Sequence, residues 1–296
     1  MTMSETTLNL ESLDATFGAI IRDIELSAIG DDLELLLHEA WIEYALLIFP
    51  GQFLTRPQQD DFARRFGDLE FGAAPITNID GDGHVLSDSR DDVVKSLRGN
   101  QGWHHDSTYM PRQAKGAFFS AEIVPASGAP TAWADMRAAY DALDDATRSQ
   151  ISELSAYHSL YYSQDRAGYL PTQNKAGGYD MYGYHDRAVS LRPLVKIHPE
   201  TGRPNLLIGR HAYGIHGMDE TESERLLDRL TEEACRPPRV IEYQWNAGDA
   251  VLWDNRRLMH RGIPFDMTQP RRMWHTRIAG DVASEMATNH ARTMLG

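Results

Sequence analysis

Hydrophobic residues recur every three or four positions along residues 31–44, which indicates an amphipathic helix that packs against a core. A run of apolar residues follows from Ala45 to Phe49, and its Pro-Gly ending is typical of a buried strand that stops at a turn. Thr55 and Gln58 then have the spacing of a capping box and predict a second helix. We therefore expect the N-terminal part to place helix, strand and helix against a sheet.

Beyond residue 71 the pattern changes to short apolar runs separated by turn residues. Residues 72–99 are rich in Gly and Asp, and we expect a loop there with one short strand near residues 74–79. Further strands are expected at residues 117–123, 131–133, 191–198, 205–209, 240–245, 249–253 and 272–279, and helices at 136–143, 146–154 and after Asp219. Many short strands with few helices among them favour a jelly roll over a parallel sheet.

Residues 157–187 form the least regular span of the chain. Seven tyrosines lie in it among Gly, Asp and Gln residues: Tyr157, Tyr161, Tyr162, Tyr169, Tyr179, Tyr182 and Tyr184. A loop of this length inside a compact domain is usually functional or disordered. Two interpretations are open, a lid that closes over an aromatic substrate and a solvated excursion whose tyrosines shield the core. Because the sequence contains no internal repeat or linker, we expect one domain over residues 1–296 that carries this insert.

The composition limits the partners of the chain. Its 29 Lys and Arg residues against 43 Asp and Glu residues give a net charge of −14, which argues against nucleic acid and anionic membranes. A small anionic substrate must therefore be attracted by local Arg or Lys side chains. Cys235 is the single cysteine, so an intramolecular disulfide is excluded, and a reducing cytoplasm is expected. Neither a signal peptide nor an apolar run of membrane-spanning length is visible.

The segment Gly102–Tyr109 carries the first candidate chemistry. On a strand, His104 and Asp106 point to one face and His105 points to the other. One more ligand completes the two-histidine, one-carboxylate set that binds non-haem iron(II) and leaves coordination positions open. An isolated His-x-Asp pair is often accidental, but a buried strand at residues 250–253 leads into His260, a suitable third ligand.

These residues resemble a known enzyme family. The matching set is Trp103-His104-x-Asp106, Thr131-x-Trp133, Trp253-Asp254-Asn255, His260 and Arg271. It is similar to the taurine/2,4-dichlorophenoxyacetate dioxygenase family of iron(II)/2-oxoglutarate enzymes, over nearly the whole chain. Residues 45–52, 134–140 and 198–204 resemble most the aryloxyalkanoate dioxygenases that cleave (S)-phenoxypropionate herbicides.

The resemblance implies a mainly β fold, a double-stranded β-helix of the cupin-like jelly-roll type with helices packed outside. It implies Fe(II), 2-oxoglutarate and O2 as cofactor and co-substrates, with His104, Asp106 and His260 as metal ligands. Arg271 and Thr131 would bind the distal carboxylate of 2-oxoglutarate. The implied reaction hydroxylates a small carboxylate such as a phenoxypropionate or phenoxyacetate, which releases a phenol, a keto acid, succinate and CO2. A homo-oligomer is also expected from the family.

The substrate residues are less defined. Alternation along residues 271–277 places His275 and Arg277 on the face of Arg271. Other family members have a second arginine where this chain has His275, so Arg277 is a candidate for the acid anchor, with a structural ion pair as its alternative. Asn100 and Tyr109 are the other substrate candidates. The stretch of residues 71–76 lacks the His and Tyr with which taurine enzymes bind a sulfonate, and this predicts a more apolar pocket.

Three other functions use the same residues. A zinc hydrolase would use the His104, Asp106 and His260 triad with a nearby carboxylate base and without an arginine anchor. An oxygenase of this family that acts on a sulfonate or sulfate ester is a second alternative, and a jelly-roll binding module that has lost catalysis is a third. The remaining histidines are expected on sheet faces or the surface: His105, His198, His211 and His216.

Overall fold

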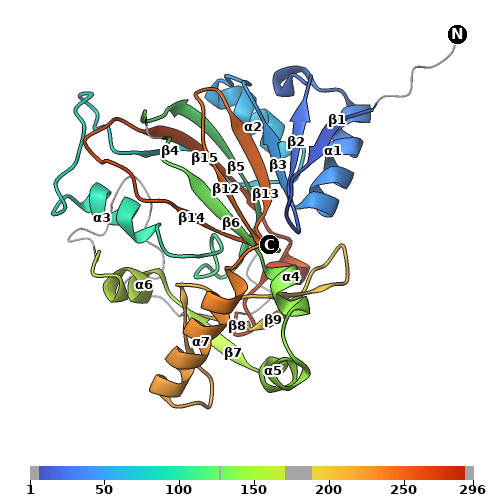
Figure 1. Cartoon of the computed structure of the whole chain (residues 1–296), viewed down its shortest axis with the longest axis vertical. Coiled ribbons are helices and arrows are strands. Elements are labelled where there is room, and N and C mark those ends of the chain that lie inside the picture. The colour runs from blue at the N-terminus through green and yellow to red at the C-terminus, as the bar shows by residue number, and fades with distance from the viewer. Residues whose placement is uncertain (1–6, 127, 171–188, 291–296) are drawn as a thin grey trace, which may run out of the picture.

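The largest element of the computed structural model is a seven-stranded sheet in the order β1-β2-β3-β13-β5-β15-β4 (Figure 1). The structure describes residues 7–126, 128–170 and 189–290. The strands are β1 (Asn9–Ser12), β2 (Ala19–Arg22), β3 (Leu46–Phe49), β13 (Ala250–Asp254), β5 (Ala114–Ile123), β15 (Arg272–Ala279) and β4 (Leu69–Thr77). Neighbouring strands are antiparallel except β2 and β3. Segments from both ends of the chain therefore share one sheet.

Three smaller sheets complete the β-structure. Their strands are β12 (Val240–Tyr243), β6 (Thr131–Asp135) and β14 (Leu258–Gly262); β11 (Ala212–Ile215), β7 (Ser155–His158) and β8 (Ser190–Pro193); and β10 (Pro204–Leu206) and β9 (Val195–Ile197). Trp133 of β6 and Leu258 of β14 pack in one buried cluster with Ile48, Trp253 and Met273 of the large sheet. Two sheets thus enclose a shared core, as the jelly-roll prediction requires.

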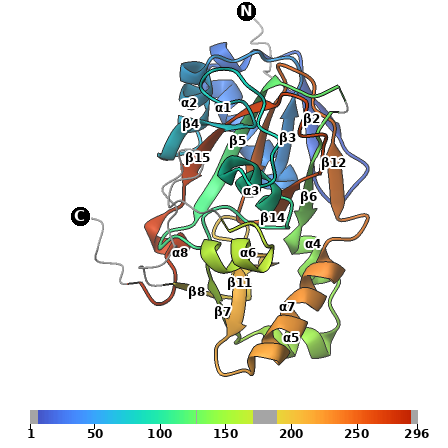
Figure 2. The same cartoon turned by 90° about the vertical axis from the view of Figure 1, so that its left-hand side faces the viewer.

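Helices cover the outside of the sheets (Figure 2). They are the short 3-10 helix η1 (Leu26–Ala28), α1 (Asp31–Tyr44), α2 (Arg56–Arg64), α3 (Asp92–Gly99), α4 (Met136–Asp141), α5 (Asp145–Ile151), α6 (Leu160–Arg166), α7 (Glu220–Ala234) and α8 (Val282–Glu285). Trp41 of α1 and Phe62 of α2 pack against Phe118 and Leu252 of the large sheet. The predicted capping box of α2 is confirmed, because Thr55 and Gln58 cap each other's backbone.

Residues 72–99 are more regular than their composition indicates. The strand β4 begins at Leu69, and α3 begins after Asp91, whose carboxylate accepts from the backbone N–H groups of Val93 and Val94. The prediction of a loop with one short strand is therefore wrong for α3. The helix is only eight residues long, and its apolar spacing at Val93, Val94 and Leu97 is too short to stand out from the Gly- and Asp-rich sequence around it.

The tyrosine-rich span also begins with regular structure. Its first residues lie in β7 and α6, and the hydroxyl of Tyr162 donates to Glu224 of α7 at 3.0 Å. The prediction of an irregular insert is wrong for this part. Residues 171–187 of the span, with Tyr179, Tyr182 and Tyr184, lie outside the described residues.

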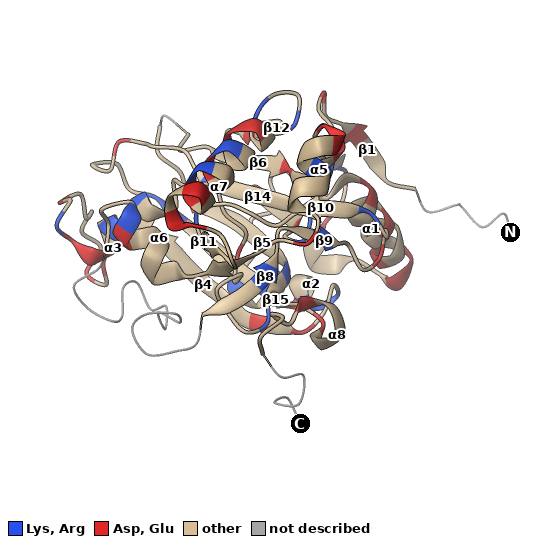
Figure 3. Cartoon of the chain, turned by 90° about the horizontal axis from the view of Figure 1, so that it is seen from below, with Lys and Arg blue, Asp and Glu red and all other residues tan. Residues whose placement is uncertain are grey.

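Charged side chains of both signs are interspersed along the outer helices, for example on α3 and α7 (Figure 3). Of the helices within residues 7–126, 128–170 and 189–290, none combines the length and the apolar character needed to cross a membrane.

Candidate active site

Three buried side chains, those of His104, Asp106 and His260, converge at one cavity. Their potential metal-binding atoms all lie within 4.8 Å of one another. His260 lies on β14, and the backbones of His104 and His260 are joined by two hydrogen bonds of 3.0 and 2.8 Å. The Nδ1 of His104 donates to the carbonyl of Gly102 at 2.7 Å, so its Nε2 is the atom left for a metal. The structure brings together the three predicted ligands.

Asp106 reaches this cluster by a turn. Of the segment that carries it, His104 alone pairs as in a sheet, and Ser107 has a left-handed φ of 56°. The expectation that His104 and Asp106 share one strand face is therefore wrong, although both side chains arrive at the same place. His105 points the other way, as expected, and its Nδ1 donates to the carbonyl of Asn255 at 2.8 Å.

The three groups have the protonation states that a cationic metal requires. Burial lowers the pKa of His104 well below its usual value and lowers the pKa of His260 to about 4. Both imidazoles are therefore neutral near pH 7. Burial raises the pKa of Asp106, but the cation of Arg277, with His260 and His275, outweighs burial and holds this pKa well below the usual range. Two neutral imidazoles and one carboxylate fit Fe(II).

A buried cation lies in the same cavity. The side chain of Arg271 is inside the protein, and burial lowers its pKa to about 10, so it keeps its charge near pH 7. Its guanidinium lies 5.8 Å from the ring centre of Phe265, but within the described part of the chain it has no carboxylate or hydrogen-bond partner. Thr131 also lines the cavity, and its hydroxyl oxygen accepts from the indole of Trp245 at 3.0 Å. The Thr131 proton is therefore left to donate to a ligand.

One part of the cavity wall is apolar. It includes residues of β4, α3, β5, α6 and the segment before β15: Ile76, Leu97, Phe119, Leu160, Ile263 and Phe265. Such a wall suits a hydrophobic or aromatic group, in line with the apolar pocket that the sequence predicts.

The four predicted substrate residues, Asn100, Tyr109, His275 and Arg277, all line this cavity. Two of them face the metal-binding carboxylate. Arg277 donates to an oxygen of Asp106 at 3.0 Å, and the Nε2 of His275 lies 3.4 Å from the other oxygen. Arg277 thus forms an ion pair with Asp106 inside the protein. A structural ion pair is the alternative to its role as an anchor for the substrate acid.

Arg210 and His211 also line the cavity, although the sequence did not predict them as site residues. Arg210 donates to the carbonyl of Gly99, to the side-chain oxygen of Gln164 at 3.1 Å and to that of Asn100 at 3.2 Å. It therefore joins the ends of α3 and α6 at the cavity. The local signal is Gly209, which has a φ of 106° and whose backbone approaches the carbonyl of Trp103 too closely for a side chain.

His211 is buried and lines the cavity, just before β11 begins. The expectation of a position on a sheet face or on the surface is therefore wrong. Its Nδ1 lies 2.9 Å from the hydroxyl of Ser163, which itself donates to a backbone carbonyl, so His211 is the donor in this pair. Its ring also packs edge-on against His104 and Tyr109.

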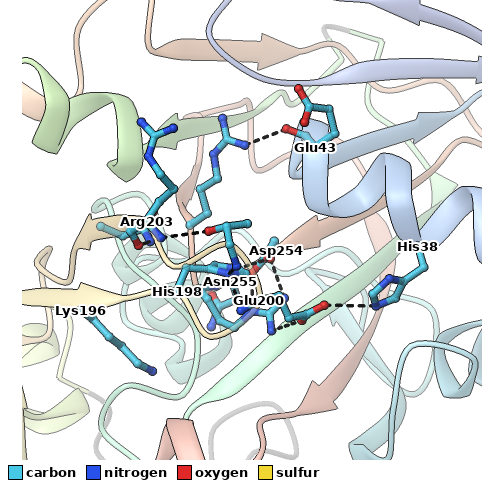
Figure 4. Close-up of polar contacts among 12 residues, drawn as sticks. His38, Glu43, Lys196, His198, Glu200, Arg203, Asp254 and Asn255 are labelled. Carbon is cyan, nitrogen blue, oxygen red and sulfur yellow. Dashed lines mark hydrogen bonds and ion pairs between the residues drawn. The ribbon is translucent and has the colours of Figure 1, made fainter.

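A buried ionic network supports the turn between β13 and β14 (Figure 4). Asp254 accepts from the Nε2 of His198 at 2.9 Å and from the guanidinium of Arg256. Arg256 also pairs with Glu200, which lies 3.5 Å from His38 of α1. The hairpin of β9 and β10 and helix α1 therefore both stabilise the turn that leads to His260.

The two sheets present two histidines and a carboxylate beside a buried arginine whose guanidinium has no partner among the described residues. This is the arrangement of a non-haem metal enzyme that takes an anionic ligand. The model of the family named taurine catabolism dioxygenase TauD, TfdA family, matches residues 9–277. The chain belongs to this family. The expected family and fold class are confirmed.

Related proteins and structures agree over nearly the full length. The chain is 57% identical to an (S)-phenoxypropionate/alpha-ketoglutarate-dioxygenase of Sphingobium herbicidovorans, over 95% of this chain and 98% of that protein. It is 52% identical to the protein of the same name from Delftia acidovorans, over 96% and 99%. The crystal structure of AAD-2 in complex with Mn(II) and N-oxalylglycine superposes with a TM-score of 0.86 at 34% identity, over 96% of this chain and all of that one.

Proposed function

We propose that this protein is an Fe(II)/2-oxoglutarate-dependent dioxygenase that cleaves aryloxyalkanoates, with (S)-2-phenoxypropionate as the first substrate to test. The observation that carries the proposal is Arg271, a buried cation without a protein partner in the described residues, in the same cavity as the triad. An unpaired buried charge is costly and is expected where a ligand supplies its counter-charge. The two (S)-phenoxypropionate enzymes above support the choice of substrate.

The triad of His104, Asp106 and His260 would hold the iron. When bound with 2-oxoglutarate, the metal supplies oxygen activation for hydroxylation of an unactivated carbon. Arg271 offers the planar, charged donor that suits the distal carboxylate of 2-oxoglutarate, and Thr131 adds a hydroxyl donor beside it. Hydroxylation at the carbon that carries the aryloxy group gives a hemiketal, which collapses to a phenol and pyruvate.

The carboxylate of the substrate needs its own anchor. Arg210 is a second candidate beside Arg277, which pairs with Asp106 and donates to Ser107 at 2.9 Å. Arg210 lines the cavity beside His211 and donates to neutral oxygens. The apolar wall from β4, α3 and α6 would then receive the aromatic ring. Arg277 is the alternative anchor. Substitution of each arginine in turn, with the affinity for the substrate as the readout, distinguishes the two.

The other functions have less support. A zinc hydrolase needs a carboxylate base beside the metal, but Asp106, itself a ligand candidate, is the only carboxylate among the described residues that line the cavity. For the alternative of a sulfate ester or sulfonate oxygenase, the apolar part of the wall favours an aryl substrate over a small one like taurine. The single domain, the homo-oligomer and the cytoplasmic location stay predictions.

The decisive experiment is anaerobic titration of Fe(II) and 2-oxoglutarate into metal-free protein, followed by exposure to O2 with each enantiomer of 2-phenoxypropionate. We expect the weak visible absorption band of an iron–2-oxoglutarate chelate, and phenol and succinate in equal amounts with the (S)-enantiomer. His260→Ala should abolish the band. Absence of the band in the wild type, with zinc retained on purification, would refute the dioxygenase assignment. A normal band without phenol would refute only the substrate.

A further inference from the structure

Among the described residues, the backbone of Asp106 has no strand partner, because the chain leaves the sheet after His104 and turns at Ser107. A buried backbone N–H or carbonyl without a partner is costly, so some other group must satisfy it. The side chain of Asn255 does so. Its Oδ1 accepts from the N–H of Asp106 at 2.7 Å, and its Nδ2 donates to the carbonyl of Asp106 at 2.9 Å. The amide of Asn255 thus replaces a neighbouring strand at the metal-binding residue.

Asn255 is itself held firmly. Its side chain is fully buried, its Nδ2 also donates to the carbonyl of Ala114 at 2.8 Å, and its backbone N–H donates to Lys115 at 3.0 Å. Its carbonyl accepts from His105. The residue lies directly after Asp254, in the network drawn in Figure 4. It therefore links the rigid end of β13 and β5 to the turn that presents Asp106.

The side chain of Asn78 makes a comparable set of backbone hydrogen bonds beside Arg271. It follows the last residue of β4, and its Oδ1 accepts from the backbone N–H of Arg271 at 2.8 Å. Its Nδ2 donates to the carbonyls of Met267 at 2.9 Å and Gln269 at 3.0 Å. Asn78 is also fully buried. The side-chain amide of Asn78 therefore holds the backbone N–H of Arg271, while the Arg271 carbonyl accepts from the hydroxyl of Thr77 at 2.7 Å.

We propose that Asn255 and Asn78 are a matched pair of positioning residues, Asn255 for the metal-binding carboxylate and Asn78 for the co-substrate arginine. This inference rests on the proposed function. Each asparagine accepts one hydrogen bond from the residue that it positions and donates two, so loss of either amide removes a similar number of buried bonds. Asn255 supports the site of the metal, and Asn78 supports the site of the co-substrate. If the two asparagines were only structural, their loss would weaken the binding of both ligands alike.

The test measures two affinities in each variant. Free Mn(II) is followed by electron paramagnetic resonance during titration of metal-free protein, and N-oxalylglycine binding is then measured by calorimetry at saturating Mn(II). Asn255→Ala is expected to weaken Mn(II) binding by about 10-fold or more, the usual cost of losing a group that orients a metal ligand. Its affinity for N-oxalylglycine at saturating metal should stay within roughly threefold, a change of well under 1 kcal/mol by the relation of affinity to free energy.

Asn78→Ala is expected to give the reverse result, with Mn(II) binding within roughly threefold of the wild type and N-oxalylglycine binding about 10-fold weaker, the cost of one lost charge-assisted contact. Each variant is the control for the other. Unfolding in urea is measured for both. Asn255→Ser and Asn78→Ser, which keep a polar atom at each position, repeat the comparison if an alanine variant does not fold.

Two results would overturn the proposal in different ways. If both variants lose both affinities in parallel with their stability, the asparagines are only structural and the positioning role fails. If the wild-type protein itself binds neither Mn(II) nor N-oxalylglycine, the proposed dioxygenase function fails. Opposite losses in the two variants support the inference.

Discussion

Replacement of Arg271 by methionine should stabilise the ligand-free protein and, at the same time, weaken its binding of 2-oxoglutarate. Burial lowers the pKa of Arg271 from 12.5 to about 10. At about 1.4 kcal/mol per pH unit, this corresponds to about 3 kcal/mol of unfavourable free energy for the charged side chain in the folded state. Removal of the charge therefore stabilises the folded state, and loss of the cation–π contact with Phe265 offsets ~1 kcal/mol of this stabilisation. The expected net stabilisation is about 2 kcal/mol.

The effect on binding has the opposite sign. In the variant, the distal carboxylate of 2-oxoglutarate enters a buried site without its cation. Truncation of one partner of a buried charge pair costs about 2–5 kcal/mol, so the dissociation constant should rise about 30-fold or more. The assay combines urea unfolding of the metal-free protein at pH 7.5 with calorimetric titration of 2-oxoglutarate at saturating Mn(II).

Arg272→Met is the matched control. Arg272 is the next residue, lies on the opposite face of β15 and pairs with Glu122 at 3.2 Å near the surface. Its replacement should change the unfolding free energy by less than about 1 kcal/mol and leave 2-oxoglutarate binding unchanged. A loss of stability in Arg271→Met, or unchanged 2-oxoglutarate binding, would refute the interpretation of Arg271 as a cation kept for a ligand.

Two further predictions concern pH and salt. Burial holds the pKa of His260 at about 4, below the ordinary 6.5, so the unfolded chain binds the proton first. The unfolding free energy of metal-free protein should therefore be constant between pH 7 and 8. Between pH 6.5 and 4 it should fall by about 3 kcal/mol or more, because His260 contributes about 3 kcal/mol and burial also lowers the pKa values of His104 and His105. Urea titrations test this, and a rise would contradict it. Because the chain has a net charge of −14, it should repel an anionic substrate, and added salt should screen this repulsion. The value of kcat/KM between 20 and 200 mM NaCl, roughly a threefold change in Debye length, should then not fall, and a steep fall would instead indicate long-range attraction.

The sequence predicts those elements whose causes are local. The helix α1, the buried strand β3 and the capping box at Thr55 each depend on residues within one or two turns of the chain. The triad and Arg271 were found because their residue types and spacing match a family pattern, and the family itself is confirmed. The roles of the individual site residues stay predictions.

The site residues that the sequence did not predict depend on partners that are distant in the chain. Asn255 contacts a residue 149 positions away, and Asn78 contacts one 193 positions away, so no local pattern reveals either role. Arg210 and His211 reach the cavity because Gly209 allows a close approach of two backbones, which is a tertiary feature. The helix α3 is a different case, because its signals, the Asp91 cap and the spacing of Val93, Val94 and Leu97, are local but span only eight residues.

The charge of the cavity is opposite to that of the whole chain. Among the described residues that line it, Arg210, Arg271 and Arg277 face a single carboxylate, that of Asp106, while the full sequence has an excess of 14 acidic residues. Attraction of an anion is therefore confined to short range, where low dielectric makes each charge effective. Arg277 neutralises Asp106 in part, Arg271 is left for the co-substrate, and Arg210 lies at the ends of α3 and α6. Selectivity among anions must then come from the apolar wall, because all carboxylates meet the same cations.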